Sequence, residues 1–193
     1  MSLIKLKSAT KDYIWGGTKL KEIYKDVKSD KIAESWVLSF HDDGPSIIDS
    51  SKNHGKLLKD VLSKAEIGTK INEFPFFPVL IKIIDSKGDL SVQVHPSDEY
   101  ALKNENSFGK TEVWHILSHE KDAKLYLGLN DNYSKDEIEK AINEGTILKY
   151  MNAYNVNDGE TYFVKSGTLH AIGKGITLIE IQENSNLTYR VYD

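Results

Sequence analysis

Cysteine is absent from this chain of 193 residues. The absence excludes disulfides and thiolate metal sites, so any bound metal ion must use histidine nitrogen, carboxylate oxygen or amide oxygen. Long hydrophobic runs are also missing, and none approaches the ~18 apolar residues that cross a membrane. The first ten residues mix lysine with leucine and isoleucine and lack the apolar core of a signal peptide. We therefore expect a cytoplasmic protein with no membrane partner.

The chain also lacks a strong excess of charge of one sign. Its formal net charge is -4, and lysines are spread along its whole length. Without a basic block, the sequence offers no nucleic-acid surface. Hydrophobic residues make up 39% of the chain, which is enough for a domain with its own core. Because no repeat, low-complexity tract or linker divides it, we expect residues 1–193 to form a single domain.

Short apolar runs bounded by glycine, proline and aspartate recur along the chain and predict strands. The expected strands are 35–40, 46–49, 79–84, 90–94, 111–117, 123–129, 160–164, 176–182 and 187–192. Helical spacing predicts short helices at 56–65 and 97–102 and a longer one at 135–144. Ser134 and Glu137 form a capping-box pattern at the start of the longer helix. Many short strands with little helix favour an antiparallel sandwich or barrel.

Four polar residues on or next to these strands are candidates for holding a metal ion. Gln93 and His95 are two residues apart in an expected strand, so they share a face. Glu112 begins the next strand, with His115 on the opposite face, and His170 closes a loop after a later strand. A lone histidine in a β protein is more often structural. The combination of nitrogen and oxygen ligands, however, suits zinc, and also iron, manganese or nickel.

The spacing of these residues resembles the two conserved motifs of the cupin superfamily. The segment Gly159-(x)5-Lys165-x-Gly167-x-x-His170 resembles the second motif, with lysine where proline is usual. Gly88 followed by Gln93-x-His95 resembles the first motif, with glutamine in place of its first histidine. The glutamate that normally follows within a few residues is delayed to Glu112.

This substitution and this delay together resemble the type I mannose-6-phosphate isomerases, in their short bacterial form. Further motifs agree in order along nearly the whole chain. They are Asp12-Tyr-Ile-Trp-Gly-Gly17, Glu34-Ser-Trp36, Gln93-Val-His-Pro96, Gly109-Lys-Thr-Glu-Val-Trp114, Ser166-Gly-Thr-Leu-His170 and Thr188-Tyr-Arg-Val-Tyr-Asp193.

The resemblance implies a mostly β fold, a cupin jelly-roll barrel with a few short helices, that holds one zinc ion per chain. The implied zinc ligands are Gln93, His95, Glu112 and His170. Arg190, Lys110 and Lys82 match active-site positions of the family, which makes them candidates for catalysis and substrate binding. Most lysines in such a sequence have solvated side chains. Lys82 differs because it lies inside an apolar run, where a buried charge needs a partner.

The implied activity is the interconversion of mannose 6-phosphate and fructose 6-phosphate through an enediolate, with a sugar phosphate as the small-molecule partner. Zinc would act as a Lewis acid on the sugar oxygens. Lys110 and Lys82 are both candidates for moving the proton, which would require a pKa lowered from ~10.4. Arg190 could grip the phosphate or stabilise the enediolate.

Two alternatives stay open. One is a metal-dependent cupin enzyme of different chemistry, such as an iron dioxygenase or another sugar isomerase. The other is a truncated or stand-alone metal-binding cupin that binds sugar phosphate without efficient catalysis. Family members continue beyond the position that matches Asp193, so we expect the C-terminal β domain of the family to be absent from these residues. Weak or absent isomerase activity is then expected, because Arg190 would lie only three residues from the terminus. Self-association is also expected, because apolar surface would be uncovered.

Overall fold

The computed structural model describes residues 3–193, and its fold is mostly β, as the sequence predicts. The strands are β1 (Leu6–Lys7), β2 (Ala9–Lys11), β3 (Glu34–Leu38), β4 (Ile47–Ile48), β5 (Val79–Ser86), β6 (Val92–Val94), β7 (Glu112–His119), β8 (Lys124–Leu129), β9 (Met151–Asn155), β10 (Thr161–Val164), β11 (His170–Ile172), β12 (Ile176–Glu183) and β13 (Tyr189–Tyr192). The α-helices are α1 (Lys19–Ile23), α2 (Leu58–Val61), α3 (Lys64–Ile67), α4 (Asp98–Asn104) and α5 (Lys135–Asn143).

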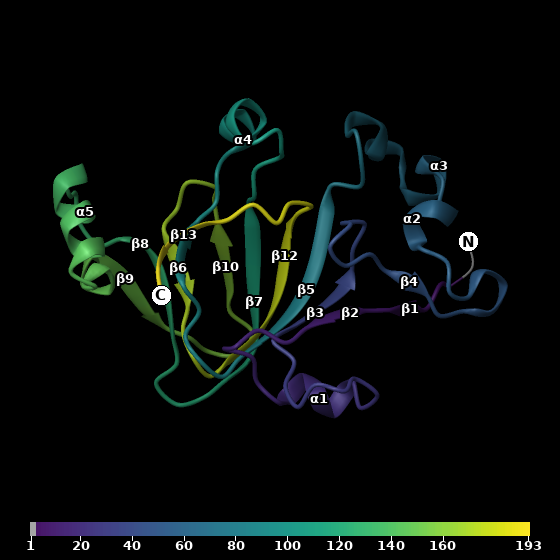
Figure 1. Cartoon of the computed structure of the whole chain (residues 1–193), viewed down its shortest axis with the longest axis horizontal. Coiled ribbons are helices and arrows are strands. Elements are labelled where there is room, and N and C mark those ends of the chain that lie inside the picture. Colours follow the sequence, from purple (N-terminus) through teal and green to yellow (C-terminus); the bar gives the residue numbers. More distant parts are fainter. Residues whose placement is uncertain (1–2) are drawn as a thin grey trace.

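Two antiparallel sheets make up most of the molecule (Figure 1). A six-stranded sheet has the order β10-β7-β12-β5-β3-β2, and a five-stranded sheet has the order β13-β6-β11-β8-β9. Strands β1 and β4 form a separate pair beside α2 and α3. Neighbouring strands of the larger sheets are far apart in the sequence, since β12 lies between β5 and β7. Residues from distant segments therefore meet inside the barrel.

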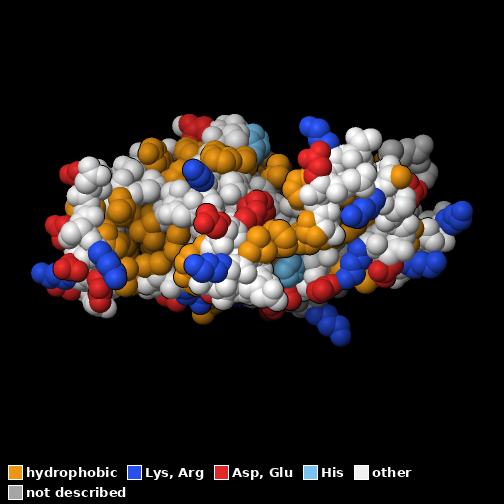
Figure 2. Space-filling view, turned by 90° about the horizontal axis from the view of Figure 1, so that it is seen from above, with side chains coloured by type: hydrophobic (Ala, Val, Ile, Leu, Met, Phe, Trp, Pro, Cys, Tyr) orange, Lys and Arg blue, Asp and Glu red, His pale blue; other side chains and the backbone are white. Residues whose placement is uncertain are grey.

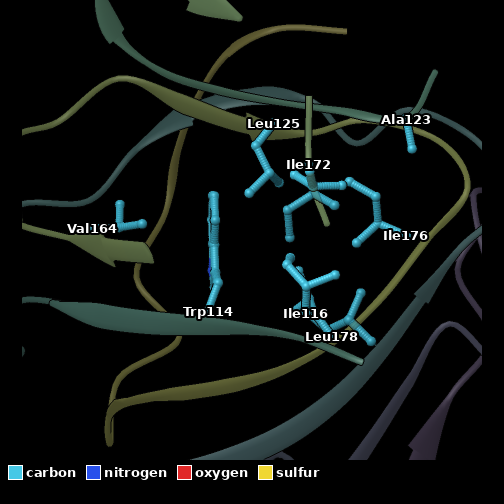
Figure 3. Packing of buried hydrophobic residues seen from close by; sticks show 10 residues of the cluster. Trp114, Ile116, Ala123, Leu125, Val164, Ile172, Ile176 and Leu178 are labelled. Carbon is cyan, nitrogen blue, oxygen red and sulfur yellow. The ribbon is translucent and has the colours of Figure 1, made fainter. Parts of the chain in front are cut away.

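The main hydrophobic core lies between the two sheets (Figure 3). Trp114 and Ile116 of β7 pack with Leu178 of β12 from one sheet, and with Leu125 and Ile172 from the other. All five side chains are almost completely buried. Each buried side chain of this kind contributes roughly 1.5–3 kcal/mol relative to an exposed one, so this cluster holds the sheets face to face.

The helix caps follow the sequence in two places. Ser134 and Glu137 form the predicted capping box of α5, and the Ser97 hydroxyl accepts a hydrogen bond from the backbone N–H of Tyr100 at the start of α4. The continuous helix predicted at 56–65 is wrong. There the chain forms α2 and α3 instead, because Ser63 is extended and starts a new capping box with Glu66.

Four strands were not predicted, namely β1, β2, β9 and β11. Strand β9 pairs with β8, and its last three residues are exposed, so it shows no alternating apolar pattern. Strand β11 has only three residues and begins at His170, which the sequence placed in a loop. Strands β9 and β11 both pair with β8, and β11 also pairs with β6; local sequence does not show such long-range partners.

A second hydrophobic cluster covers the outer side of the five-stranded sheet. Ala141 of α5 and Ile147 pack there with Val92 of β6 and Ala171 of β11. On the face seen in Figure 2, hydrophobic side chains gather mainly on the left, the side on which Figure 1 places α5. On that face the Lys and Arg side chains are scattered, with several of them on the right of the view. Within residues 3–193, no helix is long and apolar enough to cross a membrane.

Candidate metal centre

Three buried residues from separate strands converge at one end of the barrel interior. His95 directly follows β6, Glu112 begins β7, and His170 begins β11. Each offers one ligand atom, and these atoms all lie within 4.8 Å of one another. The antiparallel pairing of β6 and β11 places the two histidines on adjacent strands. Three of the residues that the sequence singles out are thus brought together by the fold.

The hydrogen bonds of the two histidines determine which ring nitrogen is free. Nδ1 of His95 lies 3.0 Å from the Leu187 carbonyl oxygen, and Nδ1 of His170 lies 2.8 Å from that of Thr168. A carbonyl oxygen only accepts, so each Nδ1 carries the proton. Both Nε2 atoms are then unprotonated, and they lie 3.2 Å apart. Two lone pairs that face each other across so short a gap repel each other. A cation between or beside them would relieve this repulsion.

Burial keeps both imidazoles neutral. It lowers the pKa of His95 to about 2, helped by the positive charge of Lys110. It also lowers the pKa of His170, to about 4. A neutral imidazole is the form that binds metal ions, so neither ring needs to lose a proton at neutral pH.

Glu112 completes the cluster with a buried carboxylate that forms an ion pair with Lys110. Its oxygens lie 3.7 Å from His95 Nε2 and 3.5 Å from His170 Nε2, and neither oxygen has a hydrogen-bond partner of good geometry. Burial raises the pKa of Glu112 to about 7, although the ammonium group of Lys110 opposes this. A buried carboxylate beside two imidazole lone pairs is the donor set of a divalent metal site, and the residues present fit such an ion.

Gln93 lies next to this cluster. It is in β6, where it pairs with His170 of β11 on one side and with Arg190 of β13 on the other. Its half-buried side chain lines the adjoining cavity. The assignment of its amide oxygen as the fourth ligand stays a prediction.

The two predicted lysines are both buried, as the apolar surroundings of Lys82 suggested. Lys110 Nζ lies 2.8 Å from a Glu112 oxygen and 3.2 Å from His95 Nε2. Lys82 Nζ lies 4.9 Å from the centre of the Trp36 ring. Burial lowers the pKa of Lys110, but Glu112 and a second carboxylate, Glu180, outweigh this effect, and the net pKa is raised.

Two carboxylates that balance these lysines were missed as functional residues by the sequence reasoning. Glu180 Oε1 lies 3.3 Å from Lys82 Nζ and 3.6 Å from Lys110 Nζ. Glu34 lies 3.7 Å from Lys82 and accepts a hydrogen bond from Trp36 Nε1. The sequence could have pointed to Glu180, since it shares the inward face of β12 with Leu178. A charge on a buried strand face needs a partner.

A cavity of about 260 Å³ adjoins the cluster. Four predicted site residues line it, together with Glu180 and Glu34; these four are Gln93, Lys82, Lys110 and Arg190. Arg190 is the only arginine of the chain. Its exposed side chain stands at the rim, 3.6 Å from a carboxylate oxygen of Asp193. The cavity therefore has buried ammonium groups in its wall and a guanidinium group at its edge.

A larger groove of about 600 Å³ lies elsewhere, between Phe40, Phe77 and Phe108. It contains none of the predicted site residues and no buried ion pair. Size alone would favour this groove, but the chemistry favours the smaller cavity, which has convergent charged groups beside a metal-type donor set.

Fold and site together define a β-barrel with a candidate metal site beside a small, charged cavity. Residues 3–155 match the phosphomannose isomerase type I catalytic domain. The chain belongs to this family. Its fold is therefore of the cupin type, as the motifs implied.

Individual relatives agree with this assignment. The chain is 39% identical over 188 residues to the mannose-6-phosphate isomerase ManA of Bacillus subtilis, covering 97% of this chain and 59% of that protein. It is 38% identical to the mannose-6-phosphate isomerase of Streptococcus mutans over 189 residues, covering 97% and 60%. The crystal structure of the Bacillus subtilis mannose 6-phosphate isomerase superposes with a TM-score of 0.87 at 37% identity, covering 98% and 61%. The chain thus spans about 60% of the length of these relatives.

Proposed function

We propose that this chain carries the zinc centre of a mannose-6-phosphate isomerase, which interconverts mannose 6-phosphate and fructose 6-phosphate through an enediolate. The observation that carries the proposal is the pair of unprotonated Nε2 atoms facing Glu112, next to a lysine-lined cavity. In this proposal His95, Glu112, His170 and the amide oxygen of Gln93 hold one zinc ion. All four residues lie within one domain.

The charges around the cavity suit an anionic sugar. Three buried carboxylates face two buried ammonium groups; these groups are Glu34, Glu112, Glu180, Lys82 and Lys110. When Glu112 is ionised and the histidines are neutral, one negative charge is in excess. A divalent cation would convert this to one positive charge in excess. The guanidinium group of Arg190 at the rim adds to it. A sugar phosphate, and the enediolate formed from it, would be stabilised in such a field.

The reaction requires no external oxidant or reductant. A proton leaves C2 of mannose 6-phosphate and a proton is returned to C1, while a second proton moves from O2 to O1. A bound zinc ion would supply Lewis acidity toward the sugar oxygens. The protein must hold the sugar still, stabilise negative charge on O1 and O2, and carry the proton between the two carbons.

The positions of the basic residues suggest how these tasks are divided. Arg190 at the open rim is placed to grip the phosphate, since its planar fork binds phosphate oxygens in pairs. Lys110 lies beside the metal ligands, and Lys82 lies on the neighbouring wall. We propose Lys110 as the first candidate for the proton carrier because it is closer to the metal ligands. The neighbouring carboxylates raise its pKa, so this role requires the charge of a bound zinc ion to lower it again. Lys82 is the second candidate.

The direct test is a coupled assay of fructose 6-phosphate formation with the metal content measured on the same sample. Isomerase activity that rises with bound zinc supports the proposal. Zinc-loaded protein that binds mannose 6-phosphate in calorimetry without converting it supports the alternative of a binding cupin. Activity with iron and oxygen on another substrate would indicate a different cupin chemistry.

A further inference from the structure

One carboxylate is shared by both buried lysines. Glu180 is 4% exposed. Its Oε1 atom lies 3.3 Å from Lys82 Nζ and 3.6 Å from Lys110 Nζ, while Oε2 accepts a hydrogen bond from Trp114 Nε1 at 3.3 Å. Oε1 therefore takes part in two ion pairs, and the hydrogen bond of Oε2 ties the group to the hydrophobic core.

The strand register explains why this residue reaches both lysines. Glu180 stands in β12, directly opposite Lys82 in β5 on one side and opposite Trp114 in β7 on the other. Lys110 lies just before β7 and folds back toward the same point. Directly opposite residues in antiparallel strands have neighbouring side chains. The central strand of the three thus places its carboxylate between two ammonium groups from its neighbours.

The charged states of Glu180, Lys82 and Lys110 depend on one another. Burial opposes ionisation of Glu180, but Lys110 and Lys82 outweigh it and lower its pKa to about 2. The two ammonium groups would repel each other in the barrel interior without a shared anion. Lys82 retains Glu34 at 3.7 Å, and Lys110 retains Glu112, which is also a proposed zinc ligand. Glu180 is the carboxylate that contacts both lysines.

We propose that Glu180 is a positioning residue that holds the ammonium groups of Lys82 and Lys110 together at the cavity wall. The inference rests on the proposed function, because the lysines are taken to act on a sugar phosphate. Although Glu180 lines the cavity, it would act on the reaction through the two lysines and would not coordinate the metal ion. Its role would be to fix where two positive charges stand when negative charge develops on the sugar.

The decisive variant is Glu180→Gln, which keeps the shape and an oxygen that can accept from Trp114. Removing a negative charge makes the cavity more positive, so KM for mannose 6-phosphate should stay the same or fall. The kcat should drop by about tenfold or more, because the lysines lose their fixed positions. If the substitution instead loosened the fold as a whole, KM for mannose 6-phosphate would rise. Zinc content should be unchanged.

A double-mutant cycle with Lys82→Met shows whether Glu180 acts through that lysine. In the Lys82→Met background, adding Glu180→Gln should lower kcat much less than it does in the parent protein. This double variant also removes one charge of each sign, so it remains informative if Glu180→Gln alone folds poorly. Asp85→Asn is the matched control. Asp85 is a buried carboxylate of β5 that accepts from the Lys19 backbone N–H, and its loss should lower Tm while kcat stays the same.

Crystal structures of the zinc-loaded parent protein and of the Glu180→Gln variant test the role of Glu180 separately from the proposed function. In the variant, Lys82 Nζ should leave its place beside the Trp36 ring, whatever the activity of the parent protein. Unchanged positions of both lysines, an unchanged kcat, or fully additive effects with Lys82→Met would each overturn the positioning role. A parent protein that binds zinc but does not isomerise mannose 6-phosphate would overturn the proposed function, and the lysine positions would still decide the role of Glu180.

Discussion

His95 and His170 are 75 residues apart in the chain, yet their Nε2 atoms lie 3.2 Å from each other. Each ring is held from behind by a backbone carbonyl oxygen, that of Leu187 or of Thr168. The carbonyl oxygens fix the tautomers and the ring orientations before any metal ion arrives. Such support is typical of metal-binding histidines, whose remote nitrogen donates to a carbonyl or carboxylate group.

The first prediction concerns metal content. His95→Ala and His170→Ala should each remove most of the zinc, since each deletes one of the two facing nitrogen donors. His115→Ala is the control, because His115 lies on the outward side of β7 beside Thr161. Elemental analysis after dialysis measures the outcome. Full zinc occupancy in the double variant of His95 and His170 would place the metal site elsewhere.

The second prediction concerns Arg190. Arg190→Ala should raise KM for mannose 6-phosphate by about tenfold or more, the cost of losing a bidentate contact to phosphate. Arg190→Lys should recover only part of the affinity, since an ammonium group cannot make the paired contact. Steady-state kinetics at saturating zinc gives both values. Kinetic constants equal to those of the parent protein would reduce Arg190 to a surface charge.

A third prediction separates the two lysines. Lys110→Met should lower kcat by roughly 100-fold or more, the scale of a lost general acid or base, and should stop exchange of the C2 hydrogen with solvent. Lys82→Met should slow the same exchange less. Mannose 6-phosphate labelled with deuterium at C2 and followed by NMR distinguishes these cases. Normal exchange in both variants would mean that another group carries the proton.

The sequence predicted much of this site because short motifs combine with strand periodicity. Glu112 and Trp114 share the inward face of β7 as expected, and His115 lies on the other face. The burial of Lys82 followed from its apolar neighbours. The capping box of α5 followed from Ser134 and Glu137, two residues that interact locally.

Features that depend on long-range pairing were beyond the sequence. The contacts of Glu180 require β12 to lie between β5 and β7, and local pattern does not contain that order. The same applies to β11, a three-residue strand that exists through its pairing with β8. The break between α2 and α3 was visible in Ser63 and Glu66, but the apolar spacing across them outweighed it in the prediction.

The fourth prediction concerns pH. In the folded protein the pKa of Glu180 is about 2, below the ~4.3 of an unfolded glutamate. The unfolded chain therefore binds the proton first, and the stabilisation by Glu180 is present above about pH 4.5 and is lost as the pH falls toward 2.

Urea unfolding of the metal-free parent protein and of Glu180→Gln, at several pH values between 7 and 3, tests this. The difference in the free energy of unfolding between them should be largest at pH 7 and should shrink below about pH 4.5. A difference that stays constant over the whole range would show that the charge of Glu180 does not stabilise the fold.

The most direct measurement for the account as a whole is a titration of the metal-free chain with zinc, with isomerase activity read at each point. We expect fructose 6-phosphate formation to rise in proportion to bound zinc and to level off near one ion per chain. We also expect that no activity returns in the double variant of His95 and His170. A folded chain that binds one zinc ion at these residues and does not convert mannose 6-phosphate would contradict it.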